Sequence, residues 1–324
     1  MRHPVRRLVV VGSVVGEFRL SIPNRPEPGG SVRAEHNVVQ AGGCYRAIGT
    51  ARTLGLPAVL VGRFGDNPVG RLLRVSLSRI DVEMPVRAVP GEHGYTVLAV
   101  ENNADVTRIE VAGVESTLTR SEIERVALTP EDAVLIFGTD LVSHQAGTAI
   151  AGWVADGGLG EATLVFAPGP LAPDIPDTVF DAVIGRTDIL TLNGSEFALI
   201  TGVSLPQDRQ AAATELLGSL GPAAMMLVRV DGQGCWLVRR DAGASWFDAP
   251  APNGSGATTE CRLSAHLGIF LAELARLDDP VEATRIATLG WTRVPGPDIP
   301  WVTALGPGRA ELDALAAGYP PAPA

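Results

Sequence analysis

The chain has 324 residues, of which 46% are hydrophobic and 19% charged, and its formal net charge is −10. This composition excludes a disordered chain, a collagen and a coiled coil, and the acidic balance argues against a nucleic-acid partner because an acidic surface repels phosphates. No apolar run reaches the ~18 residues that a membrane span needs, so no membrane partner is expected. The cysteines Cys44, Cys235 and Cys261 are too widely spaced for a disulfide framework or a zinc site. We therefore expect a reduced, cytoplasmic protein.

Short apolar runs of strand length alternate along the chain with stretches of helical patterning. The first run, residues 8–11, follows basic residues but precedes no signal-peptide cleavage pattern, so it is interpreted as a buried strand. Strands that alternate with helices indicate an α/β fold with a mainly parallel sheet covered on both faces. Further strands are predicted at 58–61, 133–137, 163–166, 189–192 and 224–230, and helices at 47–54, 69–80, 146–155 and 209–217.

Two segments interrupt this alternation. Residues 18–39 and 95–111 carry strand-like patterns with no helix between them. We expect each to contribute to a small antiparallel flap beside the main sheet, close to the turn at Gly42 and Gly43. The proline-rich residues 319–324 are expected to form a disordered tail.

Four ordered motifs connect the chain to a known family. They are GSVVGE at residues 12–17, AGG at 41–43, VGRFGDNPVG at 61–70 and LNGSEFALITG at 192–202. Their order and spacing resemble those of the PfkB family of sugar and nucleoside kinases, the ribokinase-like group, over nearly the whole chain. The resemblance implies a ribokinase-like three-layer sandwich over residues 1–318, with a β lid from about residues 18–39 and 95–111. It also implies a sugar-like or nucleoside-like substrate, ATP and Mg²⁺ as cofactors, and a homodimer formed through the lid.

The segment that carries the chemistry in this family departs from the family pattern. The motif DTxGAGDxF supplies a general base and a helix N-terminus for the transferring phosphoryl group, shortly before the last long helix. Without gaps, Leu263 takes the place of the catalytic aspartate and Glu260 that of the first motif glycine. In a second register, Gly254 and Gly256 match the motif glycines and Ala257 replaces the aspartate. Both registers agree that no aspartate lies between residues 249 and 277.

Two ionisable residues near this segment are candidates for a displaced catalytic group. Glu260 either acts in place of the missing base or simply caps the last long helix, whose dipole favours a carboxylate there. His266 follows Leu263 by three residues on the same side of the helix, so it either faces the old active site or is a packing or surface histidine. Neither register assigns a catalytic residue.

The resemblance also carries over binding positions. Glu17 stands where the family has a substrate-binding aspartate, and Gly42 and Gly43 form its Gly-Gly pair. Arg46 stands near the family's asparagine, where it either binds an anionic ligand or is a solvated helix residue. For the nucleotide and its phosphates, the resemblance points to Asn193, Glu196, Arg229, Gly234, Gly254 and Gly256.

Asn193 and Glu196 allow two interpretations. In relatives this pair organises magnesium and phosphates through water, so Glu196 is a candidate indirect magnesium ligand, and no direct metal ligand is assigned. The same spacing also forms a capping box at a helix start, whether or not a nucleotide binds. Asp231, which replaces a glycine of the family's nucleotide loop, adds negative charge where a nucleotide would lie. We therefore expect weak or absent ATP binding.

Three functional hypotheses follow from these observations. The chain is an ATP-dependent kinase with an unusual base, a non-catalytic ligand-binding or regulatory pseudokinase, or an enzyme of another class that reuses the pocket. The family motifs favour the first, whereas the losses at Leu263, Glu260 and Asp231 favour the second. Removing a general base alone costs about 10²–10⁴-fold in rate. The sequence therefore predicts that phosphotransfer is impaired or lost.

Overall fold

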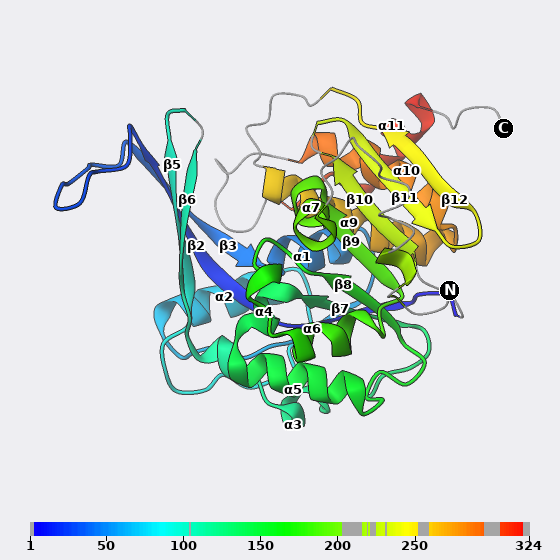
Figure 1. The fold of residues 1–324 in the computed structure, drawn as a ribbon, viewed down its shortest axis with the longest axis horizontal. Coiled ribbons are helices and arrows are strands. Elements are labelled where there is room, and N and C mark those ends of the chain that lie inside the picture. The colour runs from blue at the N-terminus through cyan, green and yellow to red at the C-terminus, as the bar shows by residue number, and fades with distance from the viewer. Residues whose placement is uncertain are drawn as a thin grey trace.

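The computed structural model describes residues 3–103, 105–202, 216–218, 220, 225–230, 232–251, 259–294 and 305–319. Within this part of the chain, a large central sheet lies between two layers of helices, and a smaller sheet projects from one end (Figure 1). Most of the helix predicted at 209–217 lies outside the described residues, although residues 216–218 are helical. Residues 320–324 of the predicted tail also lie outside them, and Gly318 ends the last helix.

The large sheet has eight strands in the order β12-β11-β10-β9-β8-β7-β1-β4. The six strands from β10 to β4 run parallel, and β11 and β12 extend one edge as antiparallel strands. All six predicted strand runs lie in this sheet. The strands are β1 (Arg7–Val11), β4 (Ala58–Val61), β7 (Asp132–Phe137), β8 (Thr163–Ala167), β9 (Ile189–Asn193), β10 (Met225–Val230), β11 (Gly234–Arg239) and β12 (Gly243–Asp248).

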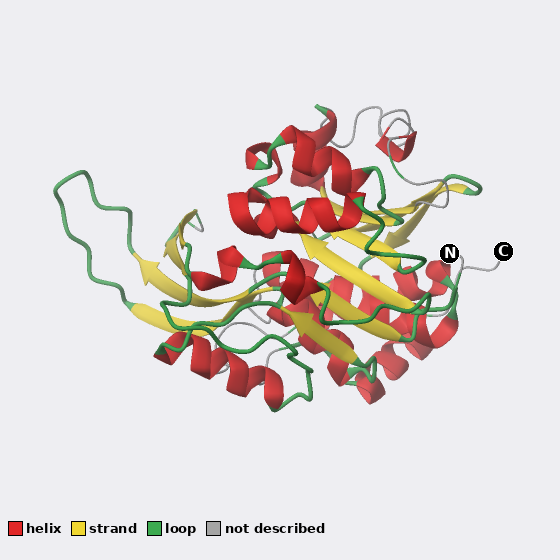
Figure 2. Cartoon of the chain, turned by 90° about the horizontal axis from the view of Figure 1, so that it is seen from below, coloured by secondary structure: helices red, strands yellow, loops and turns green. Residues whose placement is uncertain are grey.

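Helices cover both faces of the large sheet (Figure 2). One face packs against α1 (Tyr45–Thr53), α2 (Pro68–Ser78), α9 (Thr259–Leu277), α10 (Pro280–Gly290) and α11 (Arg309–Gly318). The other packs against α3 (Arg120–Ile123), α4 (Gly138–Val142), α5 (His144–Ala155), α6 (Asp177–Ile184) and α7 (Gly194–Thr201). Short 3₁₀ helices lie at η1 (Val114–Thr117), η2 (Ala172–Asp174) and η3 (Trp291–Arg293). Among the described helices, none combines the length and apolar character that crossing a membrane requires.

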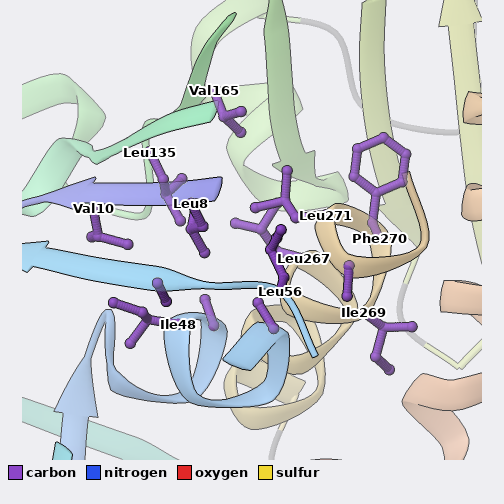
Figure 3. Close-up of a cluster of buried hydrophobic side chains, with 14 of the residues drawn as sticks. Leu8, Val10, Ile48, Leu56, Leu135, Val165, Leu267, Ile269, Phe270 and Leu271 are labelled. Carbon is purple, nitrogen blue, oxygen red and sulfur yellow. The ribbon is translucent and has the colours of Figure 1, made fainter. Parts of the chain in front are cut away.

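The alternation of side chains along each strand divides the core into two halves. Leu8 and Val10 of β1 point to the face covered by α1 and α9, whereas Val9 and Val11 point to the face covered by α5 and α6. On the first face α9 supplies Phe270, whose fully buried ring points toward the strands of the large sheet (Figure 3). Because both faces are apolar, the parallel strands have near-continuous hydrophobic sequences, which explains why they were predictable.

The two segments predicted to form the flap build a separate four-stranded sheet, called the small sheet here. Its order is β3-β2-β5-β6, and its strands are β2 (Val14–Ile22), β3 (His36–Gly43), β5 (Tyr95–Glu101) and β6 (Val106–Val111). The prediction of an antiparallel flap was wrong for its central pair, because β2 and β5 run parallel. The reason is topological: β4 and α2 intervene between the two hairpins, so no tight turn forces the second hairpin to reverse direction.

Candidate functional site

The candidate site lies at the carboxyl ends of the parallel strands, where ligands bind in open α/β sheets. The chain leaves β1 at Gly12 and immediately enters β2 of the small sheet, so the two sheets meet at this point. The helices that begin directly after β7 and β9 bring polar residues to the same edge. The site is therefore assembled from strand ends and helix starts that are far apart in sequence.

Asp140 is a buried carboxylate beside the end of β1. It lies in α4, directly after β7, and only 8% of the residue is exposed. Ser13 donates hydrogen bonds to it through its hydroxyl and backbone amide, whereas Oδ2 has no hydrogen-bond partner among the described residues. A Cβ at residue 12 would lie 2.3 Å from Oδ2, so Gly12 is needed for this close approach. Burial, reinforced by the negative charge of Glu115, raises the pKa of Asp140 to about 7.

Glu17 provides a second buried carboxylate, on β2 of the small sheet. It is 8% exposed, and its Oε1 accepts a hydrogen bond from Gln40 Nε2 on the neighbouring β3. Its Oε2 lies 3.1 Å from the place that a Cβ of residue 42 would occupy. Gly43 adopts the left-handed region with φ +63°, and a Cβ there would lie 2.6 Å from Ser13 O. The Gly42–Gly43 pair thus lets the backbone pass closely between Glu17 and the end of β1.

The first turn of α1 closes the base of this region. Arg46 is buried, with 8% of the residue exposed, so the alternative of a solvated helix arginine does not hold. Cys44 precedes the helix and is also buried. Burial, followed by the negative charge of Asp140, raises the pKa of the Cys44 thiol well above its ordinary value. The thiol therefore stays protonated and is not suited to act as a nucleophile.

Asn193 and Glu196 form the capping box that their spacing predicts. Asn193 Oδ1 accepts a hydrogen bond from Glu196 N at 2.8 Å, and Glu196 Oε2 accepts one from Asn193 N at 2.8 Å. The pair satisfies two backbone amides at the start of α7 that would otherwise lack partners. One oxygen of the candidate magnesium-linked carboxylate is therefore committed to the helix start.

A buried arginine connects this capping box to the start of α9. Arg229 is 4% exposed and lies on β10 directly opposite Asn193 of β9. Its Nη1 donates to Leu263 O at 2.9 Å and its Nε to Leu192 O at 3.3 Å. Burial lowers the pKa of Arg229, and the negative charge of Glu196 opposes this effect. The guanidinium thus points under the start of α9 rather than out of the site.

Leu263, at the predicted position of the catalytic base, and His266, three residues later, are both buried. The Leu263 residue is 8% exposed, and His266 is fully buried. His266 Nε2 lies 3.3 Å from Thr288 Oγ1, and its ring meets Trp291 edge to face. Burial, with the positive charge of Arg229 adding to it, holds the pKa of His266 well below its ordinary value. His266 is therefore a neutral packing histidine, which is one of the two alternatives considered from the sequence.

Comparison with known proteins places these features in a family. The family model described as pfkB family carbohydrate kinase matches residues 5–253. The chain belongs to the pfkB family of carbohydrate kinases. The match ends at residue 253, before α9 begins at Thr259. The part that matches thus includes Gly12, Glu17 and Glu196 but not Leu263.

Relatives of this pfkB protein include a curated protein and solved structures. An uncharacterized sugar kinase of Escherichia coli, YegV, is 24% identical over 242 residues, which are 72% of each chain. The crystal structure of ribokinase from Thermotoga maritima aligns with TM-score 0.77 at 18% identity, covering 97% of this chain and 100% of that one. Arabidopsis thaliana ribokinase, solved with ribose and ATP, aligns with TM-score 0.75 at 19% identity, covering 96% and 98%. These structural likenesses establish that the fold is ribokinase-like.

The pfkB family implies magnesium and ATP, and among the described residues Glu196 is the candidate for an indirect contact to magnesium. No group of three or more histidine, cysteine, aspartate or glutamate residues in the described ranges is arranged to hold a metal ion. Glu196 serves the capping box, and the buried Arg229 already provides a positive charge near it. Gly234 lies at the start of β11 with φ +158°. Gly254, Gly256 and the side chain of Glu260 lie outside the described residues.

The structure brings some of the sequence-predicted residues together and adds one that was missed. Glu17, Gly42, Gly43 and Arg46 lie around the junction of the two sheets, whereas Arg229, Asn193 and Glu196 lie together further along the strand ends. Asp140 did not emerge from the sequence because no motif marks it. The one available signal was a carboxylate three residues after an apolar strand run, in the sequence Phe137-Gly138-Thr139-Asp140. Asp140 reaches the site because β7 pairs with β1, and this pairing is visible only in the structure.

Proposed function

We propose that this pfkB-family protein binds a sugar-like or nucleoside-like ligand through the hydroxyl groups of that ligand, and that its ATP-dependent phosphotransfer is impaired or lost. The observation that supports ligand binding is Asp140, a buried carboxylate at the carboxyl end of the sheet, one oxygen of which has no hydrogen-bond partner in the part of the chain that the structure describes. The loss of the family's aspartate at Leu263 and the charge of Asp231 favour a non-catalytic ligand-binding or regulatory role over that of an efficient kinase. A fold shared with ribokinases does not by itself establish their activity.

Support for ligand binding comes from two carboxylates that are costly to bury. An unpartnered buried polar atom destabilises a folded protein unless a ligand or water satisfies it. Asp140 Oδ2 can accept a hydrogen bond from a ligand hydroxyl, and Glu17 Oε2 is a second buried acceptor, which lies beside the Gly42 backbone. Carboxylates at the end of β1 and on the small sheet would hold a polyol by charge-assisted hydrogen bonds.

Support for impaired phosphotransfer comes from the other half of the site. A kinase of this kind needs a carboxylate that accepts the proton of the substrate hydroxyl. Leu263, which occupies the base position in the ungapped register, is apolar and buried, and the backbone carbonyl of Leu263 accepts a hydrogen bond from Arg229. The other register places Ala257 there, and the alanine has no basic group either. The negative charges of Asp231 and Glu260 in the sequence also oppose ATP binding.

A combined binding and turnover experiment tests this function. We expect a panel of pentoses, hexoses and nucleosides to contain a compound that raises the melting temperature of the wild type and binds in calorimetry. Glu17→Gln should weaken this binding about tenfold or more, because a hydrogen bond to a charged group is lost. Glu161→Gln, which alters a carboxylate side chain that is 62% exposed, is the matched control.

In the same panel we expect negligible ATP consumption by the wild type. Leu263→Asp alone should remain inactive. In the register without gaps, Glu260 and Arg262 still occupy the positions of the two motif glycines. A dissociation constant for Mg-ATP in the low micromolar range would contradict the proposed loss of nucleotide binding. Substrate-dependent turnover near 1 s⁻¹, within the usual kinase range of roughly 1–100 s⁻¹, would contradict the pseudokinase interpretation.

We further propose a homodimer formed through the small sheet. Its strands β5 and β6 expose Tyr95, Val106, Ile109 and Val111, with 36%, 55%, 56% and 39% of each residue accessible. Apolar side chains on an edge strand invite pairing with another copy. Light scattering should give twice the monomer mass at micromolar concentration, and Ile109→Arg should give the monomer mass. A monomeric wild type at that concentration would exclude this dimer.

A further inference from the structure

The base of the small sheet contains a buried histidine that the proposed function does not use. His93 is 1% exposed and lies two residues before β5. Its Nε2 lies 2.7 Å from Val14 O at the start of β2, and its Nδ1 accepts a hydrogen bond from Gly65 N at 3.2 Å. An N–H must face the carbonyl, and a lone pair must face the amide. Both hydrogen bonds therefore require a neutral ring with its proton on Nε2.

The Gly65 turn fits closely against this histidine. Gly65 follows β4 of the large sheet, and a Cβ at this position would lie 2.8 Å from the backbone nitrogen of His93. The ring of His93 stacks on Phe64, with 5.4 Å between ring centroids and 9° between planes. One imidazole thus joins the large sheet, through Gly65, to the first strand of the small sheet, through Val14.

Glu115 provides a competing partner for the same ring nitrogen. It lies in η1 after β6 and is 7% exposed, and its Oε2 is 3.8 Å from His93 Nδ1. Its two oxygens accept hydrogen bonds of 2.7 Å from Gly94 N and Gly113 N, so it connects the start of β5 to the end of β6. A protonated ring would lose its acceptor for Gly65 and would present an N–H to this carboxylate.

Three other charged groups near His93, namely Arg74, Asp66 and Glu92, contact other residues. The guanidinium carbon of Arg74 in α2 lies 5.5 Å from the centroid of the Phe64 ring, on which His93 stacks. Asp66 and Glu92 are exposed, and each accepts a hydrogen bond from a neighbouring loop residue instead of from the ring. Glu115 is therefore the charged group placed to respond directly to protonation of His93.

We propose that His93 is a positioning residue for the small sheet, and that protonation of its ring releases the base of this sheet from the Gly65 turn. Histidine can exchange hydrogen-bond partners when it gains a proton, because the protonated ring has two N–H donors and no acceptor. Glu17 lies on β2, which starts at Val14, so the release changes the position of a candidate binding residue. The arrangement is a pH-sensitive hinge between the two sheets.

Hydrogen–deuterium exchange of the Gly65 amide in the full chain tests this hinge without any ligand. We expect its protection factor, corrected for the intrinsic pH dependence of exchange, to fall about three- to tenfold from pH 8 to pH 5, as loss of one hydrogen bond implies. Amides in the central strand β7 should keep their protection. Because no sugar or nucleotide is present, failure here and failure of the proposed function are separate outcomes.

Three variants make the test specific. His93→Gln keeps an acceptor and a donor on one planar group but does not titrate, so its Gly65 protection should stay constant with pH. Glu115→Gln removes the negative charge that favours the protonated ring, so the fall in protection should move to lower pH. His144→Gln, at an exposed histidine in α5, should behave like the wild type.

Should His93→Gln not fold, the NMR chemical shifts of the imidazole nitrogens in the wild type report the protonation of the ring directly. An equal fall in His93→Gln, constant wild-type protection, or a ring that stays neutral down to pH 5 would overturn the proposal.

Discussion

Asp140→Asn is expected to raise the free energy of unfolding at pH 8 by up to about 4 kcal/mol, a stabilisation at the expense of ligand binding. The pKa of Asp140 is raised from 3.8 to about 7 in the folded protein. Between these values the folded state keeps a proton that the unfolded chain has released, so raising the pH destabilises the wild type. Asparagine does not titrate and retains an acceptor for Ser13.

The pH dependence of this difference follows from the same two pKa values. Below about pH 4, Asp140 is protonated in both states, and the variant and the wild type should be similarly stable. The difference should grow from pH 4 to pH 7 and then stay constant. Urea unfolding at pH 4, 6 and 8 measures it, with the surface variant Glu161→Gln as control. Equal stability of Asp140→Asn and wild type at pH 8 would mean that the folded protein satisfies this carboxylate after all.

Ligand binding should respond in the opposite direction. An ionised Asp140 accepts hydrogen bonds from ligand hydroxyls more strongly than the neutral acid, so affinity should increase from pH 6 to pH 8. The asparagine variant should lose this increase and should bind about tenfold or more weakly at pH 8. Residues of a binding site often reduce the stability of the protein that carries them, and Asp140 would provide a measurable example.

Removing both arginines that neutralise Glu273 is expected to destabilise the protein by about 3–5 kcal/mol, the range for an uncompensated buried charge. Glu273 lies in α9 and is fully buried. One oxygen accepts a hydrogen bond from Arg276 Nε at 2.9 Å, and the other from Arg309 Nη1 of α11. Arg309 also donates to Leu54 O at 3.0 Å. The double variant Arg276→Ala, Arg309→Ala would leave the carboxylate buried without a partner.

Two controls separate the effect of the buried charge from the loss of arginine packing. Adding Glu273→Leu to the double variant should recover a large part of the lost stability, because the buried charge is then gone. Arg285→Ala interrupts the pair with Glu282, whose side chain is 32% exposed, and should cost less than the double variant because that carboxylate can be hydrated. Urea unfolding at pH 7 provides all four values. If the triple variant were no more stable than the double one, the unpaired carboxylate would not be the cause.

The large sheet could be predicted from the sequence because both of its faces are buried. Runs such as Ala58–Val61 are apolar at every position, and the strand has these bounds in the structure. The capping box at the start of α7 also depends on local sequence. Asn193 and Glu196 are three residues apart, and this spacing is enough to predict the box that they form. Local patterns of this kind depend on few residues and change little with the rest of the fold.

Long-range arrangement was the part that the sequence could not predict. Nothing local indicates that β2 and β5 run parallel, because their pairing joins Gly16 to Tyr95 across the intervening β4 and α2. Asp140 acquires its environment from Ser13, which approaches it only because β1 pairs with β7. Arginine side chains are mostly exposed in proteins, and the sequence does not show that packing buries both Arg46 and Arg229. Burial of polar groups is set by tertiary contacts, and motif matching does not report it.

The position of β1 has a consequence for how the protein is made. The first strand of the chain lies inside the large sheet, where Arg7 pairs with Asp132 of β7 and Leu8 with Ala58 of β4. A nascent chain on the ribosome therefore holds an apolar strand with one open edge until residues 132–137 of β7 have been synthesised. Open edges of this kind template aggregation. Fragments that stop before residue 132 should depend on chaperones during translation, whereas chains extended past β7 should be released from them.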